Sequence, residues 1–272
     1  MATADVSAPS LARRLGGVID RAVTDLGDLS LFVCGVLRWT ARRPGRGTLL
    51  PIFYSIGVLS IPVVVVTGAF IGMVMAVQSF AQFNQFGFAT RLGAMINISV
   101  VRELGPVLAA VMLAGRVGGS MAAELATMRI TEQIDALSCL GANPVHYLAV
   151  PRFLACVLLI PLLTIIADFM GVLGGALVSI QIFHIDAHYY WKNTEGFVDL
   201  FDIATGLIKS IFFGAAIAVI SCHRGFHSDP GAEGVGRAAT RAFVASFIVI
   251  LALDFFLGLF LNNLHRSLWP RT

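Results

Sequence analysis

The stretch FLACVLLIPLLTIIADFMGVLGGALVSIQIF, residues 153–183, has a single charged side chain, Asp168. A helix needs about 20 apolar residues to cross the roughly 30 Å hydrocarbon core of a bilayer, so this stretch is long enough to span a membrane. Four more stretches qualify, at about residues 52–77, 96–121, 202–222 and 242–264. Since 57% of the chain is hydrophobic and 13% charged, the sequence predicts an all-α integral membrane protein with five transmembrane helices.

Basic residues are distributed unevenly around these spans. With a cytoplasmic N-terminus, 13 of the 19 Lys and Arg residues fall on the inner side. Cytoplasmic loops of membrane proteins carry such an excess, so we expect the N-terminus in the cytoplasm and the C-terminus outside. The first 50 residues hold seven arginines and four aspartates. They lack the short apolar core and cleavage site of a secretory signal peptide.

The region before the first span has a helical pattern of its own. Over residues 10–38, apolar residues recur at spacings of three and four, with charged residues mostly on the opposite face. This pattern predicts an amphipathic helix in the membrane interface, with packing on a soluble partner as the alternative. The segment RRPGRG (42–47) then breaks the helix. We therefore divide the chain into an N-terminal region, 1–47, and a five-span domain, 48–272.

Ionisable residues occur inside the predicted spans: Arg102, Glu103, Asp168, Lys209 and Asp254. Each costs on the order of 3 kcal/mol in hydrocarbon, so such groups usually face a cavity or a partner. Arg102 and Glu103 are adjacent and point about 100° apart on a helix, so they do not simply pair with each other. An ion pair of Lys209 with Asp254 or Asp168, contact with a ligand, and a proton relay are the interpretations left open.

The segment TEQIDALSCLGANPVHYLAVPR, residues 131–152, lies between the second and third spans, on the predicted cytoplasmic side. Thr131 suits an N-cap, Glu132 and Asp135 suit the first turns, and Gly141 suits the end of a helix. A short helix at about 131–141 is therefore predicted, either to dock on a partner or to rest on the protein's own helices. Its apolar stripe comprises Ile130, Ile134, Leu137 and Leu140.

Signals for chemistry in the chain itself are weak. No phosphate-binding loop of the G-x-x-x-x-G-K-[ST] type occurs, and the glycine-rich 229–241 lacks its Lys-Ser/Thr pair. His184 with His188, and His223 with His227, are spaced for one helical turn, but a third metal ligand is not evident. The four cysteines lack C-x-x-C spacing, which argues against a disulfide framework. No basic-aromatic patch indicates nucleic acid, so we expect no metal, cofactor or nucleic acid bound by this chain.

Glycines recur at helix-packing spacing in three places: Gly68 with Gly72, Gly115 with Gly119, and Gly171 with Gly175. Such pairs let two helix backbones approach closely in lipid. Packing within the chain and dimerisation are both compatible with the pattern.

Three blocks of sequence resemble one known family. They are VVRELGPVLAAVMLAGRVGGSMAAELATMRITEQIDAL (100–137), NPVHYLAVPRFLA (143–155) and GAEGVGRAATRAFVASFIVILALDFFL (231–257). Together they resemble the MlaE/YrbE family, permeases of ABC transporters that work with MCE-domain lipid-binding proteins, with a likeness running from about residue 50 to 260. The resemblance implies a homodimer in the cell inner membrane. It also implies separate cytoplasmic ATPase subunits that bind ATP and Mg²⁺, and MCE-domain proteins on the outer side.

The resemblance further implies that the chain moves phospholipid or a related lipid between the inner membrane and an MCE-domain protein, in support of outer membrane lipid asymmetry. It assigns 131–141 as a coupling helix moved by the ATPase, through Thr131, Glu132, Gln133, Ile134, Asp135 and Leu137. It places lipid in an outward-opening cavity at the dimer interface, lined by Met75, Gln78, Gln82, Phe83, Phe86, Arg102, Glu103 and Leu104.

Two other classes of function remain open from the residues alone. A proton-coupled secondary transporter of an amphiphile would use Asp168 or Asp254 as a carrier, although the chain lacks the internal repeat common in such proteins. An intramembrane lipid-modifying enzyme would need a convergent nucleophile or metal set, for which only the two histidine pairs are candidates.

Overall fold

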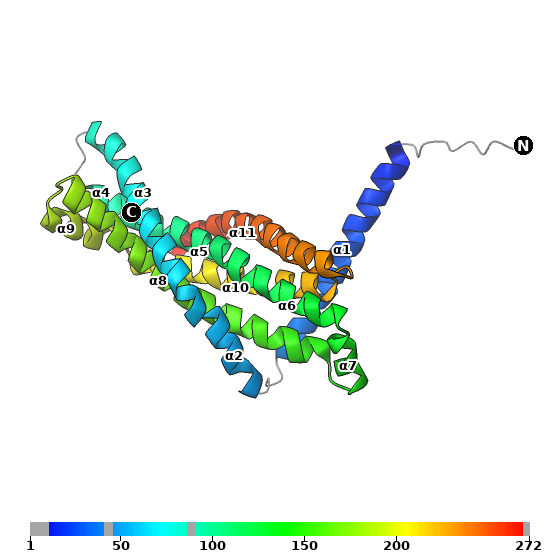
Figure 1. The fold of residues 1–272 in the computed structure, drawn as a ribbon. Helices are drawn as coiled ribbons and strands as arrows, with labels where there is room; N and C mark the ends of the chain where they lie inside the picture. Colours follow the sequence, from blue (N-terminus) through cyan, green and yellow to red (C-terminus); the bar gives the residue numbers. More distant parts are fainter. Residues whose placement is uncertain (1–10, 41–45, 86–90, 269–272) are drawn as a thin grey trace, which may run out of the picture.

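The computed structural model describes residues 11–40, 46–85 and 91–268, and nearly all of them are helical (Figure 1). Within these ranges there is no β-strand. Five segments are long and apolar enough to cross a membrane: Leu49–Phe83, Leu92–Ile130, Val145–Ile182, Leu200–Phe226 and Ala232–Ser267. Each contains nearly all of one predicted span and extends beyond it. The predicted all-α fold with five membrane-crossing helices is therefore confirmed.

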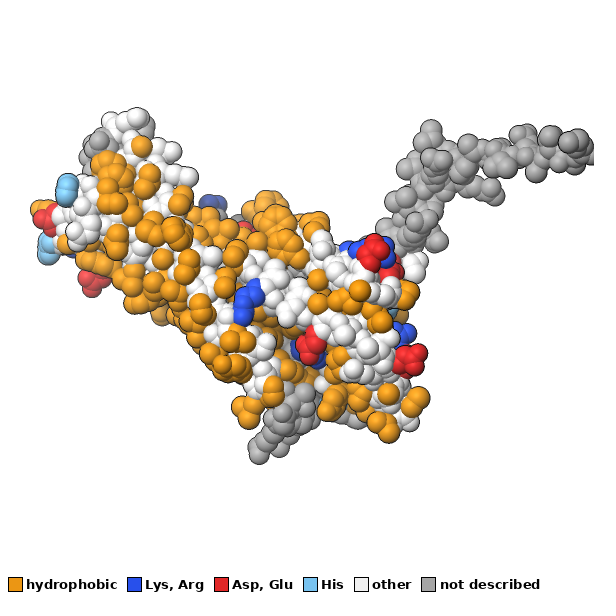
Figure 2. All heavy atoms as spheres, viewed as in Figure 1, with side chains coloured by type: hydrophobic (Ala, Val, Ile, Leu, Met, Phe, Trp, Pro, Cys, Tyr) orange, Lys and Arg blue, Asp and Glu red, His pale blue; other side chains and the backbone are white. Residues whose placement is uncertain are grey.

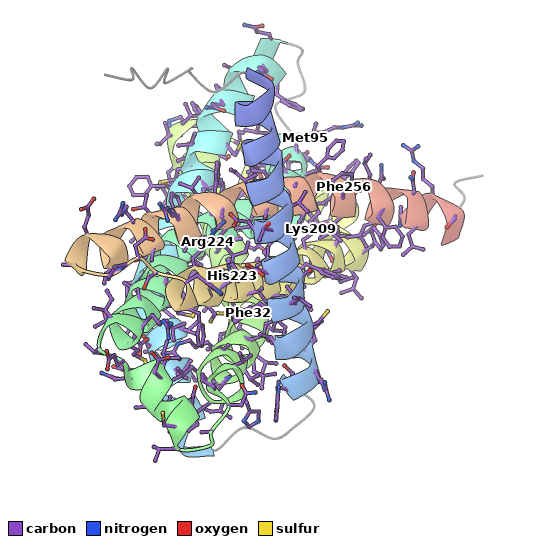
Figure 3. The ribbon with its side chains drawn as sticks, turned by 90° about the vertical axis from the view of Figure 1, so that its right-hand side faces the viewer. Phe32, Met95, Lys209, His223, Arg224 and Phe256 are labelled. Atoms are coloured by element: carbon purple, nitrogen blue, oxygen red, sulfur yellow. The ribbon has the colours of Figure 1, made fainter. Side chains whose placement is uncertain are left out.

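The N-terminal part comprises α1 (Leu11–Thr40), α2 (Arg46–Ile56), the short 3₁₀ turn η1 (Val58–Ser60) and α3 (Ile61–Gln85). α1 packs on α10 and crosses it at a steep angle (Figure 3). Its interfacial placement and the cytoplasmic N-terminus stay predictions. The stretch predicted as one span, 52–77, is divided at Gly57. The Gly57 N–H donates to the Phe53 carbonyl, and the Ser60 N–H donates to the Gly57 carbonyl. The first span therefore consists of a separate α2 and α3.

The second span is built from five consecutive segments. They are α4 (Leu92–Ser99), the π-helical turn η3 (Val100–Leu104), α5 (Gly105–Leu113), a second π turn η4 (Ala114–Gly118) and α6 (Gly119–Ile130). A π turn inserts about one extra residue into a helix. Residues on either side of it therefore face directions that an uninterrupted helical period does not predict.

The remaining elements complete the bundle. They are α7 (Gln133–Cys139), η5 (Val145–Ala149), α8 (Val150–Leu177), η6 (Val178–Ile182), α9 (Ala187–Phe197), α10 (Leu200–Phe226) and α11 (Ala232–Leu268). α9 lies between the third and fourth spans and packs on α4. The Asp186 carboxylate caps α9 by accepting from the His188 N–H at 2.7 Å, and Tyr190 is fully buried, with its hydroxyl 3.3 Å from Asn97 Oδ1. α9 thus covers the end of α4 that leads into Arg102 and Glu103.

Two of the glycine pairs join α3 to α8. A Cβ added at Gly72 would collide with the carbonyl oxygen of Gly171, and one added at Gly68 would lie 2.5 Å from the carbonyl oxygen of Ala167. Gly175 in turn lies close to the carbonyl of Gly72. The two backbones can approach this closely because glycines of both helices lie at the crossing. Packing within the chain is therefore confirmed for these two pairs.

The core and the surface are both apolar, as expected for a protein in lipid. The largest buried cluster joins α5, α8 and α10 through residues such as Leu113, Ile160 and Phe213. On the face shown in Figure 2, hydrophobic side chains cover most of the surface along the spans. Of the five described membrane-crossing segments, the one in α11 is the least covered, and Phe256 and Phe260 are 66% and 64% exposed. In the membrane this face of α11 contacts lipid or another protein chain.

Candidate functional site

The only described lysine inside a span lies at the centre of a charged cluster. Lys209 of α10 is fully buried, and its Nζ lies 2.5 Å from Glu103 Oε2 of η3 and 2.9 Å from Asp254 Oδ1 of α11. Figure 3 shows Lys209 within the body of the bundle. The predicted pair with Asp254 is therefore confirmed, while the pairing with Glu103 was missed. Because two carboxylates face one ammonium, the cluster carries one net negative charge.

The third predicted intramembrane acid, Asp168, lies elsewhere. Asp168 of α8 packs against Gly105, where an added Cβ would collide with Asp168 Oδ1. It makes no ion pair with Lys209 in the described part of the chain, and its Oδ1 is buried without a hydrogen-bond partner there. The alternative pairing of Lys209 with Asp168 is therefore wrong.

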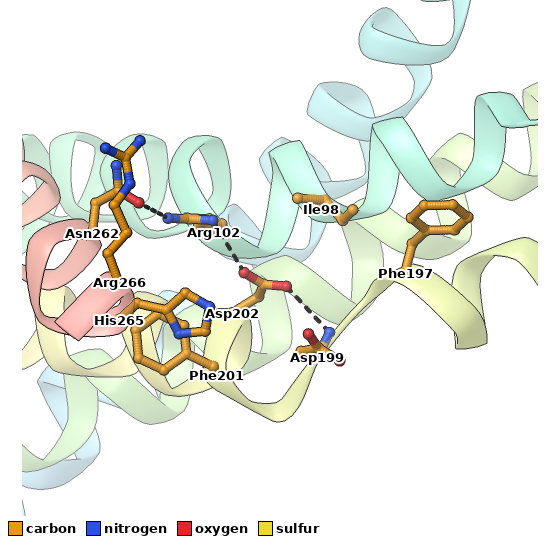
Figure 4. A pocket seen from close by; sticks show the side chains of 9 residues that line it. All are labelled: Ile98, Arg102, Phe197, Asp199, Phe201, Asp202, Asn262, His265 and Arg266. Carbon is orange, nitrogen blue, oxygen red and sulfur yellow. Dashed lines mark hydrogen bonds and ion pairs between the residues drawn. The ribbon is translucent and has the colours of Figure 1, made fainter. Parts of the chain in front are cut away.

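Arg102 precedes Glu103 but points to a different set of partners, as the sequence predicted. One guanidinium nitrogen lies 3.4 Å from Asp202 Oδ1 at the start of α10, and another lies 3.4 Å from Asn262 Oδ1 on α11 (Figure 4). The Asp202 carboxylate also accepts from the Asp199 N–H at 3.2 Å and thereby forms part of the α10 capping box. One carboxylate thus fixes the start of α10 and orients Arg102.

Two cavities adjoin these charges. One of about 540 Å³ lies beside Arg102, Asp202 and the C-terminal part of α11, where Arg266 and His265 face it (Figure 4). A second, of about 440 Å³, is bounded by Arg102, Glu103, Asp254 and the apolar side of α11. Each cavity therefore presents fixed charges beside apolar walls, an arrangement that suits an amphiphilic molecule.

The other predicted lipid-binding residues lie on a different side of the second span. Met75 and Phe83 of α3 pack into a cluster with Leu92 and Ile96, whereas Gln78 and Gln82 are exposed. Leu104 is partly buried, and Phe86 lies outside the described residues. The described cavities beside Arg102 and Glu103 include no α3 residue. A single chain therefore brings only part of the predicted set together, and the lipid contacts of that set stay a prediction.

The predicted coupling helix forms as α7, but its start differs from the prediction. The N-cap is Glu132, in the left-handed conformation at φ 58°, and not Thr131. Thr131 instead ends α6, because its N–H and its hydroxyl both bond to the Thr127 carbonyl. Gly141, at φ 76°, follows the last turn, and the Ala142 N–H bonds to the Leu137 carbonyl. This is a Schellman-type end, so the predicted termination by Gly141 is confirmed.

α7 presents two different faces. Ile134 is 4% exposed and packs with Leu137 against buried residues of α6, η5 and α1. Leu140 is 83% exposed and does not continue this packing. The outward side carries Thr131, Glu132, Gln133 and Asp135, all exposed, and Arg129 holds Asp135 at 2.5 Å. α7 therefore rests on the protein's own helices and also presents a polar surface away from the bundle.

The weak chemical signals find structural explanations. In the glycine-rich 229–241, Asp229 holds both Arg237 and Arg241, at 3.8 and 3.4 Å, as α11 begins. The rings of His223 and His227 lie 4.4 Å apart, and His223 also packs edge-on against Phe32 of α1. The described residues contain no group of three His, Cys, Asp or Glu side chains placed to share a metal ion. These side chains thus serve local packing and ion pairing.

Comparison with known proteins identifies the architecture. The model of the family "Permease MlaE" matches residues 49–260, which include four spans in full and most of the fifth. The chain belongs to the MlaE permease family. MlaE permeases are membrane subunits of ABC transporters. The chain is therefore a multi-pass permease of an ABC transporter. The family favours this function over the two alternatives, a secondary transporter and a lipid-modifying enzyme.

Relatives from distant sources cover most of this MlaE permease. A probable ABC transporter permease protein of Rickettsia felis is 39% identical over 247 residues, which are 90% of this chain and 95% of the relative. The intermembrane phospholipid transport system permease protein MlaE of Haemophilus influenzae is 36% identical over 205 residues, 75% of this chain and 78% of the relative. The chloroplastic protein TRIGALACTOSYLDIACYLGLYCEROL 1 of Arabidopsis thaliana is 37% identical over 204 residues, 75% of this chain and 58% of the relative.

Proposed function

We propose that this permease moves phospholipid or a related lipid between the cell inner membrane and an MCE-domain protein, driven by a separate ATPase subunit. The observation that carries the proposal is the likeness to the Haemophilus influenzae permease of intermembrane phospholipid transport. The cluster of Glu103, Lys209 and Asp254 supports it, because fixed charge beside an apolar cavity suits a molecule with a polar head and apolar chains.

A second copy of the chain is part of this proposal. The face of α11 that carries Phe255, Phe256 and Phe260 is exposed, and it adjoins the cavity bounded by Glu103 and Asp254. A homodimer formed through this face would enclose the cavity between two subunits. The charged cluster would then lie beside the lipid path in each half.

We further propose that the motion of the ATPase subunit is transmitted to the helical bundle through α7. ATP and Mg²⁺ would be bound by the partner ATPase, with no cofactor in this chain. The exposed side of α7, with Glu132, Gln133 and Asp135, offers polar contacts to that subunit. Ile134 and Leu137 connect α7 to α6 and η5, so a displacement of α7 would be passed to the second and third spans.

The test is reconstitution with partner subunits purified from the native membrane. Proteoliposomes containing the complex and a fluorescent phospholipid would be mixed with the MCE-domain protein, and lipid transfer would be followed with ATP, without ATP, and with a pH gradient alone. Transfer that requires ATP is expected. Transfer that depends on the pH gradient and proceeds without ATP would contradict the proposal.

A further inference from the structure

A third cavity lies farther along the second span, towards the end away from Arg102 and Glu103. It measures about 500 Å³ and is enclosed by α2, the η4–α6 part of the second span and the start of α8. Ile52 and Ile56 of α2 and Met121 of α6 form an apolar wall, while Arg116 and Arg152 supply the basic groups. Neither the predicted lipid positions nor the predicted coupling helix includes these residues.

The two arginines differ in how their charges are balanced. Arg152 is 5% exposed, pairs with Glu124 at 2.9 Å and donates to the Leu148 carbonyl at 2.8 Å. Arg116 donates to the hydroxyl of Ser60. No carboxylate of the described residues forms an ion pair with it, and its other guanidinium donors have no protein partner within that part of the chain. The cavity therefore has a net charge of about +1, located at Arg116.

The position of Arg116 along the spans follows from its neighbours in the cavity. Glu124 and Arg152 line the same cavity, and they lie near the ends of the second and third spans that flank residues 131–144. In the predicted span 96–121, Arg116 is five residues, about 8 Å of helix, from that end. With the predicted orientation this is the cytoplasmic end of the spans, near the lipid phosphates of the cytoplasmic leaflet.

We propose that this cavity binds the phosphodiester of a phospholipid headgroup in the cytoplasmic leaflet, the leaflet nearest α2. The planar guanidinium of Arg116 matches two phosphate oxygens, and one phosphodiester would balance its single charge. The wall of Ile52, Ile56 and Met121 accommodates the adjoining acyl chain. Arg102 lies 14 residues away in the same span, about 21 Å along a helix. The site is therefore separate from the proposed transport cavity and does not depend on transport.

Site-specific photo-crosslinking tests the proposal. A benzophenone amino acid would replace Ser120, an exposed residue that lines the cavity, and the purified chain in maltoside micelles would be titrated with labelled phosphatidylglycerol. A second chain would carry the crosslinker at Leu158, which is 55% exposed on α8 outside the cavity. Arg116→Gln is expected to reduce capture at position 120 about tenfold or more at subsaturating lipid, since charge-assisted hydrogen bonds are lost. Capture at position 158 should not change.

Further arms separate charge, headgroup and source. Arg116→Lys keeps the charge but loses the planar fork, so it should reduce capture less than Arg116→Gln; this variant also keeps the test decisive if the glutamine variant does not fold. Diacylglycerol, which has no phosphate, should be captured at position 120 equally in wild type and Arg116→Gln. Equal capture of phosphatidylglycerol in all three proteins would overturn the proposal. Displacement of the lipid by millimolar glycerol phosphate would assign the site to a free phosphate instead.

Discussion

Replacing Lys209 with methionine is expected to destabilise the bundle by about 3 kcal/mol. Removing one partner of a buried ion pair costs about 3–5 kcal/mol, because the remaining charge is left unpaired. The lower end applies here, since the Glu103 and Asp254 side chains are 46% and 24% exposed and are only partly enclosed by the protein. For a chain of this size, about 3 kcal/mol corresponds to a lower Tm by about 6–12 °C.

The measurement is thermal unfolding in detergent, followed by the loss of monodisperse protein on size exclusion. Lys192→Met is the matched control, because Lys192 is the chain's only other lysine and is exposed on α9; it should leave Tm unchanged. Adding Glu103→Gln and Asp254→Asn to Lys209→Met should recover at least half of the lost stability, since no carboxylate then lacks its partner. A Lys209→Met protein as stable as wild type would refute the reasoning.

Three further predictions follow from the packing and the candidate site. Gly72→Val should lower Tm by several degrees, because its side chain would collide with the α8 backbone at Gly171; Gly119→Ala, where an added Cβ meets no atom within 4 Å, is the control in the same unfolding assay. Asp135→Lys should weaken co-purification of the ATPase about tenfold, because the acidic surface of α7 is lost. Tm should stay within about 2–3 °C of wild type, since the like-charge repulsion with Arg129 is at an exposed site. Full retention of the ATPase would count against the proposed contact. A photo-crosslinker at Glu103 should capture phospholipid in the assembled complex, and capture of none would remove this position from the lipid path.

The number and placement of the membrane-crossing helices were predictable from the sequence. Hydrocarbon excludes unpaired backbone groups, so a long apolar run can only be helical there, and the 31 residues from 153 to 183 with the single charge Asp168 allow no other interpretation. The division of the first span at Gly57 was not predicted, because the apolar run continues through it and the break depends on a local change of hydrogen bonding.

The start of α7 shows a different limit. Thr131 has the side chain of an N-cap, but it also follows α6 directly, and its hydroxyl bonds back to Thr127. The chain therefore turns at Glu132, a residue that rarely adopts positive φ. Sequence preference ranks Thr131 above Glu132 at a helix start. Ile134 packs against the bundle just after this turn, a long-range contact that helix-start preferences do not include.

The directions in which the charged side chains of the second span point depend on its two π turns, which a regular helical period does not predict. Arg102 lies in η3 and Arg116 in η4, so both arginines of the central part of this span are in π turns. Each π turn shifts the residues after it by about 100° relative to an uninterrupted helix. A helical wheel of residues 96–121 that ignores this shift therefore assigns the wrong neighbours to Arg116, the charge beyond the first π turn. The two turns thus allow one apolar helix to direct Glu103 to Lys209 and Arg116 to Ser60.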